Sequence, residues 1–586
     1  MVNNKSISGK QEIANEFNNF FVHIGPKLAQ CIDTNGKKPY SDYLNRATSN
    51  NFQFSTVSTE EISKIIKSLK SKSSSGHDKI SSTFLKTLAP VLLRPLTLII
   101  NQSLTTGIFP SALKLAKVIP LHKKESTTLM DNYRPVSLLT SISKIFEKVV
   151  HIQVSEYFVK NKLFFSSQYG FREEHSTELA ALELVDHLRS ELDDKKFPIA
   201  VFMDLSKAFD TLDHSILLNK LSHYGIRNTE LLWFKSYLTD RKQYVEINQV
   251  KSSTSTIVTG VPQGSILGPL LFLIYMNDIP CASTFFKFIL YADDTSLLNA
   301  IKVSLRLNII SPNLDEINKE LNKIYDWLAV NKLSLNIKKT KYMIFHYYQA
   351  KKKVPSNISI KINSIEIERV DNFNFLGITL NKNLSWKPHT DKIAKKISKF
   401  NGVLNRLKHT LPEHILRSLY CSMIQSHLIF GILIWGFECK RLEKLQKKSM
   451  RIISRSKYNA HTQPLFKHQG ILKISDLFYL CILKFYFRYV NNKLPAYFLD
   501  FIDSRPGIYE TRHIDLILSN VTETETAQSR LRSKLPSIIN SSDPLFIEKV
   551  TTHSYKGFAK YVKSALIKKY STECTIRPCF TCNRNT

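Results

Sequence analysis

The stretch with the clearest chemical potential is Phe288–Leu298, which places two adjacent carboxylates, Asp293 and Asp294, between two runs of apolar and β-prone residues. This pattern predicts a hairpin of two buried strands with the acids at its turn. Neighbouring residues on a strand face opposite ways, so a turn is where both acids can approach one site. The two carboxylates repel each other unless cations or protons lie between them. A divalent-metal site for phosphoryl transfer is one interpretation, and a solvated Asp-Asp turn explains this stretch alone equally well.

A third carboxylate, Asp204, follows the apolar run Pro198–Met203. A continuous apolar run is typical of a buried central strand, which delivers the acid to the edge of a sheet. Acids at strand ends are common and usually inert, but here a second strand–acid unit lies downstream. Together the two units supply three carboxylates, enough to hold a pair of Mg²⁺ ions, or Mn²⁺ in their place. Two such ions about 4 Å apart would activate a 3′-hydroxyl and stabilise a leaving pyrophosphate.

Two further segments could form walls of such a site. Gly260–Pro269 holds three Gly and two Pro, so it predicts a shaped loop that lets the backbone approach a ligand, with Gln263 offering a donor and an acceptor. Ala116–Lys124 and Asp131–Leu139 predict a β-hairpin with Lys and Arg near its tip. Cations there could offset the charge of transferring phosphates. A purely structural turn and a solvated basic loop remain the alternatives for these two segments.

The whole chain is strongly basic: 82 Lys and Arg against 49 Asp and Glu give a formal charge of +33 over 586 residues. Such a field recruits polyanions, and nucleic acid is favoured over an acidic membrane surface. The eight cysteines are mostly scattered singly, as in a reducing compartment. The N-terminus lacks an apolar signal core, and the longest apolar run, Leu428–Phe437, is too short to cross a bilayer. We therefore expect a soluble, intracellular protein, nuclear or cytoplasmic and not secreted, without membrane partners.

Helical periodicity is expected in most of the remaining chain. Lys382–Lys457 interleaves cations with apolar residues at helical spacing, which suits contact with the phosphates of a duplex, with a solvated helix surface as the alternative. Cys574, Cys579 and Cys582 lack a convincing fourth zinc ligand, so unpaired tail cysteines are the favoured interpretation. The other expected helices are Glu12–Leu28, 58–70, a buried helix Ser82–Leu104 interrupted by Pro90 and Pro95, 141–160, 176–192, a core helix Leu270–Met276, and apolar helices beyond about 460.

Three motifs in this order, Asp204-Leu-Ser-Lys-Ala-Phe-Asp, Gly260-Val-Pro-Gln-Gly-Ser-Ile-Leu-Gly-Pro and Tyr291-Ala-Asp-Asp, resemble the core of a reverse transcriptase of the non-LTR (LINE-like, jockey-type) retrotransposons. Tyr133-Arg-Pro-Val-Ser-Leu-Leu and Phe375-Leu-Gly-Ile extend the resemblance. It implies an α+β right-hand polymerase: an N-terminal extension (1–50), fingers (51–200), a palm with an antiparallel sheet (201–380), a basic helical thumb (381–460) and a helical C-terminal region with its tail (461–586).

The resemblance also implies roles at matching positions and partners for the chain. The expected partners are an RNA template, a DNA primer or target and dNTPs; it leaves the oligomeric state open. Lys339 would protonate the leaving pyrophosphate, with Lys338 and Lys341 as competitors for that role. The remaining roles are metal binding by Asp204, Asp293, Asp294 and the Leu205 carbonyl, sugar selection by Phe209, a nucleotide pocket at Gln263 and Gly264, triphosphate contacts by Lys123 and Arg134, and a primer grip at Phe375, Leu376 and Gly377.

Two departures from the family pattern qualify these expectations. Ser75-Gly-His-Asp-Lys-Ile replaces the usual Pro-Gly-Pro-Asp-Gly-Ile, which weakens the expected template contact of that loop. Relatives usually carry an endonuclease-like domain upstream, and the first 50 residues cannot hold one, so target nicking is not expected of this chain. The alternatives to an active polymerase are a catalytically inactive nucleic-acid-binding relic and a domesticated, maturase-like RNA-binding protein.

Overall fold

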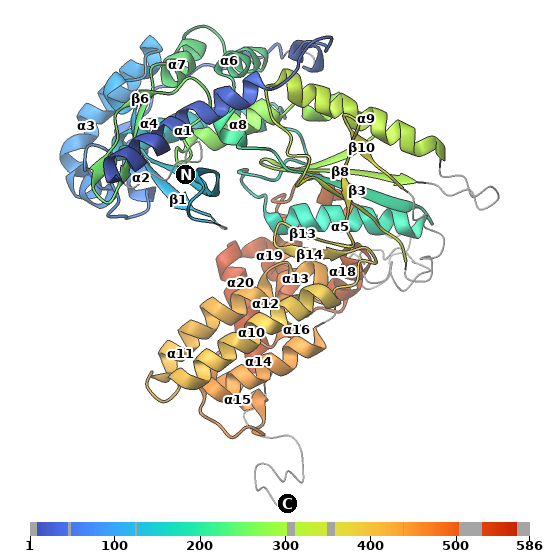
Figure 1. The fold of residues 1–586 in the computed structure, drawn as a ribbon. Coiled ribbons are helices and arrows are strands. Elements are labelled where there is room, and N and C mark those ends of the chain that lie inside the picture. Colours follow the sequence, from blue (N-terminus) through green and yellow to red (C-terminus); the bar gives the residue numbers. More distant parts are fainter. Residues whose placement is uncertain are drawn as a thin grey trace, which may run out of the picture.

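The computed structural model describes residues 9–44, 48–123, 126–301, 311–347, 358–437, 439–502 and 530–570, with the side chains of 311–313 left aside. Helices and sheets alternate up to about residue 380, and the remainder is helical (Figure 1). The α+β class expected from the sequence is therefore confirmed. The three tail cysteines lie outside the described residues.

A five-stranded sheet with the order β12-β9-β3-β8-β7 forms the centre of the molecule. Its middle strand, β3, pairs antiparallel with both β8 and β9, and β7 and β8 form an antiparallel hairpin. Every residue of β3 is buried, as its continuous apolar sequence predicts. The strands are β3 (Phe197–Met203), β7 (Lys287–Tyr291), β8 (Asp294–Ile301), β9 (Lys341–Ile344) and β12 (Glu368–Arg369).

The two faces of this sheet belong to two different hydrophobic cores, because successive side chains of a strand point to opposite faces. Ile199 and Val201 of β3 lie in one core, which also includes residues of the helices α2, α3, α4, α6, α7, α8 and α9, whose bounds are given below. Ala200 and Phe202 lie in the other core, with α5 and the C-terminal helices. The helices up to residue 330 are α1 (Lys10–Gln30), α2 (Thr59–Ser68), α3 (Ser82–Thr106), α4 (Ser141–Lys160), α5 (Thr177–Asp193), α6 (His214–His223), α7 (Asn228–Leu238), α8 (Leu267–Met276) and α9 (Ser311–Val330).

A second sheet carries the basic hairpin predicted from the sequence. β1 and β2 pair antiparallel, β1 also pairs parallel with β4, and α1 packs against β4. The helices α2, α3, α4 and α7 lie beside this sheet, at one end of the upper part of the molecule in Figure 1. The strands of the second sheet are β1 (Leu115–His122), β2 (Tyr133–Leu138), β4 (Lys242–Ile247), β5 (Val250–Lys251) and β6 (Ser255–Thr256).

The helix α3 differs from its prediction in two ways. It runs unbroken through Pro90 and Pro95, and only one stripe of it is buried, whereas Val91 and Leu98 are 77% and 70% exposed. The apolar composition was interpreted as full burial, but α3 packs mainly against α2, α7 and α4 and leaves its outer face exposed. Within the described ranges, α3 is also the one helix whose length and apolarity would suffice to cross a membrane. The sequence-based expectation that no segment could cross a bilayer considered only unbroken apolar runs, and that criterion did not identify α3.

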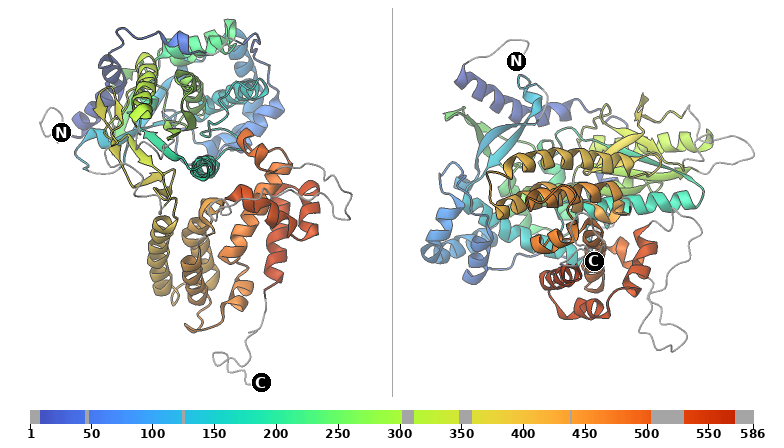
Figure 2. Two further views of the ribbon diagram at one scale, coloured as in Figure 1. Left: turned by 90° about the vertical axis from the view of Figure 1, so that its right-hand side faces the viewer. Right: turned by 90° about the horizontal axis from the view of Figure 1, so that it is seen from below.

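The chain beyond residue 370 begins with a hairpin, β13 (Asn372–Phe375) and β14 (Ile378–Asn381), and continues as helices below the central sheet (Figures 1 and 2). These helices share one core with α5 and the hairpin, so they are packed onto the back of the sheet. They are α10 (Lys387–Leu407), α11 (Glu413–Tyr420), α12 (Ser426–Ile429), α13 (Ile432–Trp435), α14 (Lys440–Ile453), α15 (Thr462–Gln469), α16 (Ile474–Val490), α18 (Leu531–Asn540), α19 (Pro544–Thr552) and α20 (Tyr555–Lys568).

Candidate active site

A cavity of about 800 Å³ opens between the basic hairpin and the central sheet. Most of the side chains singled out from the sequence line it, although they come from segments up to 216 residues apart (Lys123 to Lys339). Gly264 and the turn Phe375–Gly377 do not line it. The predicted residues in its wall are Lys123, Arg134, Asp204, Leu205, Phe209, Gln263, Asp293, Asp294 and Lys339.

The central sheet delivers the three carboxylates to this cavity. Asp204 directly follows β3, and Asp294 begins β8, whose Thr295 pairs with Met203 at the end of β3. Asp293 lies in the β7–β8 turn, where Ala292 adopts a left-handed conformation with φ of 55°. The expected strand–turn–strand arrangement of this segment is therefore confirmed. The Asp204 carbonyl accepts a hydrogen bond of 2.8 Å from the Asn336 amide, which fixes the backbone at the first acid.

The surroundings of Asp293 and Asp294 disfavour the charged form of both carboxylates. Burial and, to a lesser extent, the neighbouring Asp293 and Asp204 raise the pKa of Asp294 to about 6. Burial, together with Asp204, also raises the pKa of Asp293, although Arg134 and Lys123 oppose this. Such a shift means that the charged form is disfavoured by its surroundings. A bound divalent cation would relieve this cost.

The donor set fits a hard cation, since carboxylate and carbonyl oxygens are the ligands that Mg²⁺ prefers. Among the residues described, however, no three Asp, Glu, His or Cys side chains converge on one metal-binding point. The Asp204 side chain is 43% exposed, and its Oδ2 lies 4.0 Å from Nζ of Lys339. An ion shared by the three carboxylates therefore requires side-chain rotation from this arrangement.

Phe209 forms a rigid part of the cavity wall. Its ring stacks on Phe272 of α8, with ring centroids 4.4 Å apart and an interplanar angle of 20°. Phe171 contacts the Phe209 ring edge-on at 6.2 Å. Phe272 is fully buried, so the ring of Phe209 has firm backing.

Gln263 is held by two different contacts. Its Nε2 donates to both carboxylate oxygens of Asp210, at 2.8 and 2.9 Å, and its backbone carbonyl accepts from the amide of Ser137 at 2.9 Å. Gly264 adopts φ of 137°, and a Cβ there would overlap the Ser137 carbonyl oxygen. Gly264 therefore does not line the cavity, and its lack of a Cβ allows the loop to pack on β2. Sequence reasoning treated Asp210 only as the last letter of its motif and missed its contact with Gln263.

The two predicted cations project from the hairpin of β1 and β2. Arg134 faces Leu121 across the strand pair, and the Lys123 amide donates to the Asn132 carbonyl at 2.9 Å. Lys207 ties this hairpin to the site, because its Nζ donates to the carbonyls of Asp131 and Tyr133 at 3.3 Å each. Sequence reasoning also missed Lys207, and no local pattern marks that contact.

Position distinguishes the three competing lysines of the 338–341 segment. Lys339 lines the cavity and approaches Asp204. Lys341 instead pairs with Glu368 at 2.5 Å, and Lys338 lines a separate hollow beyond the sheet edge. Lys339 is therefore the lysine of this segment that faces the carboxylates.

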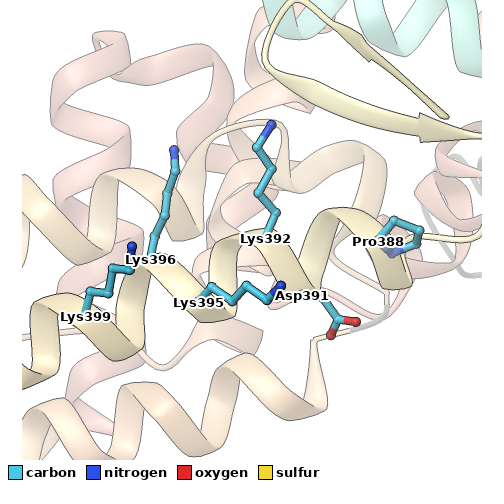
Figure 3. A pocket seen from close by; sticks show the side chains of 6 residues that line it. All are labelled: Pro388, Asp391, Lys392, Lys395, Lys396 and Lys399. Atoms are coloured by element: carbon cyan, nitrogen blue, oxygen red, sulfur yellow. The ribbon is translucent and has the colours of Figure 1, made fainter.

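The turn Phe375–Gly377 lies next to the carboxylates rather than among them. A smaller cavity of about 180 Å³ is lined by Asp204, Asp294, Phe375 and Leu376. A further hollow, beside Gly377, continues to Lys392 and Lys396 of α10. Beyond it, four lysines of α10 line an open groove (Figure 3): Lys392, Lys395, Lys396 and Lys399.

Comparison with known proteins finds one matching family. Residues 121–380 match the model of the family described as "Reverse transcriptase (RNA-dependent DNA polymerase)". This stretch of the chain is therefore similar to the reverse transcriptases. The matched range contains the three carboxylates, Phe209, Gln263 and the turn at Phe375–Gly377, and the sequence-based identification is thereby confirmed.

Three proteins of Drosophila melanogaster that are named as RNA-directed DNA polymerases of transposons or mobile elements are similar to this chain. It is 30% identical over 485 residues to the probable RNA-directed DNA polymerase from transposon BS, covering 79% of this chain and 51% of that protein. It is 27% identical to the RNA-directed DNA polymerase from mobile element jockey, covering 74% and 48%. The corresponding protein from transposon X-element is 26% identical, covering 74% and 48%. The chain thus spans about half the length of these relatives.

Proposed function

We propose that this chain is an RNA-directed DNA polymerase that extends a DNA 3′-end on an RNA template during retrotransposition of a non-LTR element. One observation carries the proposal: Asp204, Asp293 and Asp294 line the same cavity as Phe209 and Gln263. Carboxylates alone would fit many metal-dependent reactions. The rigid aromatic ring and the oriented amide beside them suit the sugar of a nucleotide, and the family match supports the same reaction.

The chemistry follows from the side chains in the cavity. Asp204, Asp293, Asp294 and the Leu205 carbonyl would hold two divalent cations, Mg²⁺ or Mn²⁺. Bound there, these ions would supply Lewis-acid activation of the primer 3′-hydroxyl and neutralise the charge that develops on the phosphates. In this proposal Lys123 and Arg134 clamp the triphosphate from the opposite wall. Positive side chains positioned in this way stabilise transferring phosphoryl groups without reorganisation during the reaction.

Lys339 is proposed to protonate the leaving pyrophosphate. Its ammonium lies 4.0 Å from Asp204 and lines the cavity, so it can reach a phosphate placed between the carboxylates and the hairpin. General acids of this kind contribute about 10²–10⁴-fold to a rate. Phe209 is proposed to exclude ribonucleotides, since a ring backed by Phe272 cannot yield to a 2′-hydroxyl.

The right-hand arrangement expected from the resemblance provides the path for the duplex. The second sheet and α2–α4 would be the fingers (51–200), the central sheet the palm (201–380), and α10–α14 the thumb (381–460). The remaining C-terminal helices (461–586) would brace the thumb against α5. The turn at Phe375–Gly377 would hold the primer end, and the lysines of α10 would contact the phosphates beyond it.

The test is extension of an oligo(dT) primer on poly(rA) with dTTP and Mg²⁺. The proposal predicts incorporation by the wild type, and loss of at least about 10³-fold in Asp293→Asn with template binding retained, since a metal ligand is removed. Equal activity of the two proteins would refute the metal-site assignment. Binding of poly(rA)–oligo(dT) without incorporation by the wild type would favour the alternatives, an inactive nucleic-acid-binding relic or a maturase-like RNA-binding protein.

A further inference from the structure

The turn Gln168–Arg172 holds a phenylalanine in the open beside the active-site cavity. Phe171 is 53% exposed, whereas the three residues before it in the turn are buried. The backbone of Phe171 has φ of 53°, a conformation that is rare and costly for a bulky side chain. Such conformations persist where the surrounding structure enforces them, and they cluster at functional sites.

The segment that carries this turn is held from two sides. On one side it pairs with the edge strand β7, because the amide of Leu290 donates to the Ser167 carbonyl at 2.9 Å and the amide of Tyr169 donates to the Leu290 carbonyl at 2.8 Å. On the other side, Nη2 of Arg488 in α16 donates to the Glu174 carbonyl at 2.5 Å and pairs with the Glu174 carboxylate at 3.1 Å. The turn is therefore fixed relative to both the central sheet and the C-terminal helices.

The turn is also joined to the catalytic hairpin. Oε1 of Gln168 accepts from the amides of Gly170 at 2.8 Å and Ala292 at 3.1 Å. Gly170 lies so close to the hairpin that a Cβ there would be 2.3 Å from the amide nitrogen of Ala292. Since Asp293 directly follows Ala292, the position of the Phe171 ring is tied to that of the carboxylates.

Phe171 lies next to the proposed position of the incoming sugar without lining the nucleotide cavity. Its ring meets Phe209 edge-on, with ring centroids 6.2 Å apart, but Phe209 is the one of the two that lines the cavity. Phe209 is the proposed contact of the 2′ position, which lies on the minor-groove side of a base pair. Phe171 is therefore placed at the same minor-groove edge, beyond the sugar that Phe209 meets.

The two strands of a bound duplex would pass on opposite sides of the catalytic hairpin. The turn Phe375–Gly377, which is proposed to hold the primer end, lies beside Asp204 and Asp294, on the side of β3 and β8. The turn that carries Phe171 instead pairs with β7, the outer strand of the sheet on the other side of β8. The strand that comes near Phe171 is therefore the template.

The turn presents an apolar surface to that strand, and its one cation is directed inward. Nη1 of Arg172 donates to the carbonyls of Phe165 at 2.9 Å and Gln168 at 3.1 Å. The next exposed side chain, Glu173, is acidic and would repel a phosphate. The minor groove of an A-form duplex is wide and shallow and displays sugars and base edges, which an exposed ring can reach.

We propose that Phe171 binds the template: its ring packs on the minor-groove edge of the template nucleotide that pairs with the incoming deoxynucleotide. This inference rests on the proposed function of the cavity, because the position of the duplex follows from that function. The link through Gln168 and Ala292 then holds this template nucleotide in register with the carboxylates. The contact is separate from the selection of the sugar by Phe209.

The experiment measures binding in the absence of nucleotides, so that no incorporation takes place. Two fluorescein-labelled RNA–DNA duplexes of mixed sequence are compared: one is blunt, and the other has a single unpaired template nucleotide at the 5′ end of its RNA strand. The wild type is expected to bind the second duplex at least about fivefold more tightly, because contact between an aromatic ring and one nucleotide provides at least that much.

The variants separate the ring from the rest of the turn. Phe171→Ala should bring the ratio of the two affinities close to one and leave the affinity for the blunt duplex unchanged. Phe171→Tyr keeps the ring and should retain the wild-type ratio. The matched control is Leu98→Ala, which removes another exposed apolar side chain, on the outer face of α3, and should also leave the ratio unchanged.

Three results would overturn the inference: an unchanged ratio in a folded Phe171→Ala protein, an equal loss of affinity for both duplexes in that variant, or a wild type that does not distinguish the duplexes. Binding needs no turnover, so its outcome is independent of the polymerase activity. A preference for the unpaired template nucleotide that depends on Phe171, in a wild type that never incorporates deoxynucleotides, would uphold the template contact while refuting the proposed activity.

Discussion

Removal of the Phe209 ring is expected to weaken the discrimination between deoxyribonucleotides and ribonucleotides. A 2′-hydroxyl can enter only if the ring withdraws from Phe272, on which it stacks at 4.4 Å. Breaking an aromatic pair costs about 0.5–1.5 kcal/mol. Displacing the rest of the ring contacts costs about 0.8 kcal/mol per methylene equivalent. With about one methylene equivalent displaced, the total of about 1.3–2.3 kcal/mol predicts that Phe209→Ala lowers the preference for dTTP over UTP by about 10–50-fold.

The assay is single-nucleotide addition on poly(rA)–oligo(dT), with kcat/KM measured separately for dTTP and for UTP. Phe171→Ala is the matched control, because it removes the edge-on contact at 6.2 Å but leaves the stack on Phe272 in place. The preference of the Phe171→Ala protein for dTTP over UTP should change by less than about threefold, because only one weak aromatic contact is lost. An unchanged preference in a folded Phe209→Ala protein would refute the role of the ring.

Three further outcomes are expected elsewhere in the chain. Gly264→Ala should lower kcat/KM for dTTP by at least about tenfold, since its Cβ would overlap the Ser137 carbonyl oxygen and displace the loop from β2. Lys339→Ala should slow single-turnover addition by about 10²-fold or more, whereas Lys341→Ala, which removes a lysine already paired with Glu368, should have little effect. Glu178→Gln should raise the free energy of unfolding in urea at pH 8 by about 1–3 kcal/mol and leave it unchanged at pH 4.

The sign of the Glu178 prediction follows from its surroundings. Burial raises its pKa from 4.5 to about 7, partly opposed by Lys484 and Arg488, and its Oε1 is buried without a hydrogen-bond partner. A raised pKa in the folded state gives stability that is complete below about pH 4.5 and is lost as the pH rises through 7. A neutral glutamine avoids that loss, so an equal effect at pH 4 and pH 8 would contradict the prediction.

Wild-type kinetics in Gly264→Ala would contradict the packing role of Gly264. Wild-type kinetics in Lys339→Ala would contradict the proton-transfer role of Lys339.

Local sequence patterns predicted the elements that present the carboxylates. The apolar run before Asp204 and the alternation around Asp293 depend on neighbours along the chain, so the strand and the hairpin could be inferred without any structure. The basic hairpin of β1 and β2 was predictable for the same reason. Composition failed for α3, because the number of apolar residues in a helix does not reveal how many of its faces are covered.

Contacts between distant segments could not be predicted. Asp210 and Gln263 are 53 residues apart, and the bond between them depends on how the loop packs against β2. Lys339 could be distinguished from Lys341 only once Lys341 was seen to pair with Glu368. The C-terminal helices were expected, but their shared core with α5 arises from the opposite face of β3 and leaves no periodic signal in either segment.

The most direct test of the proposed activity measures the rate of a single dTMP addition to oligo(dT) on poly(rA) at saturating Mg²⁺, for the wild type and for Asp204→Asn. Asp204 is decisive because it follows β3, whereas Asp293 and Asp294 come from the β7–β8 hairpin, and because it lines both the main cavity and the smaller one beside Phe375. The expected result is Mg²⁺-dependent addition by the wild type and a loss of at least about 10³-fold in the variant, with unchanged binding of the template–primer. Addition by Asp204→Asn at the wild-type rate would contradict the assignment of the three carboxylates as the catalytic centre.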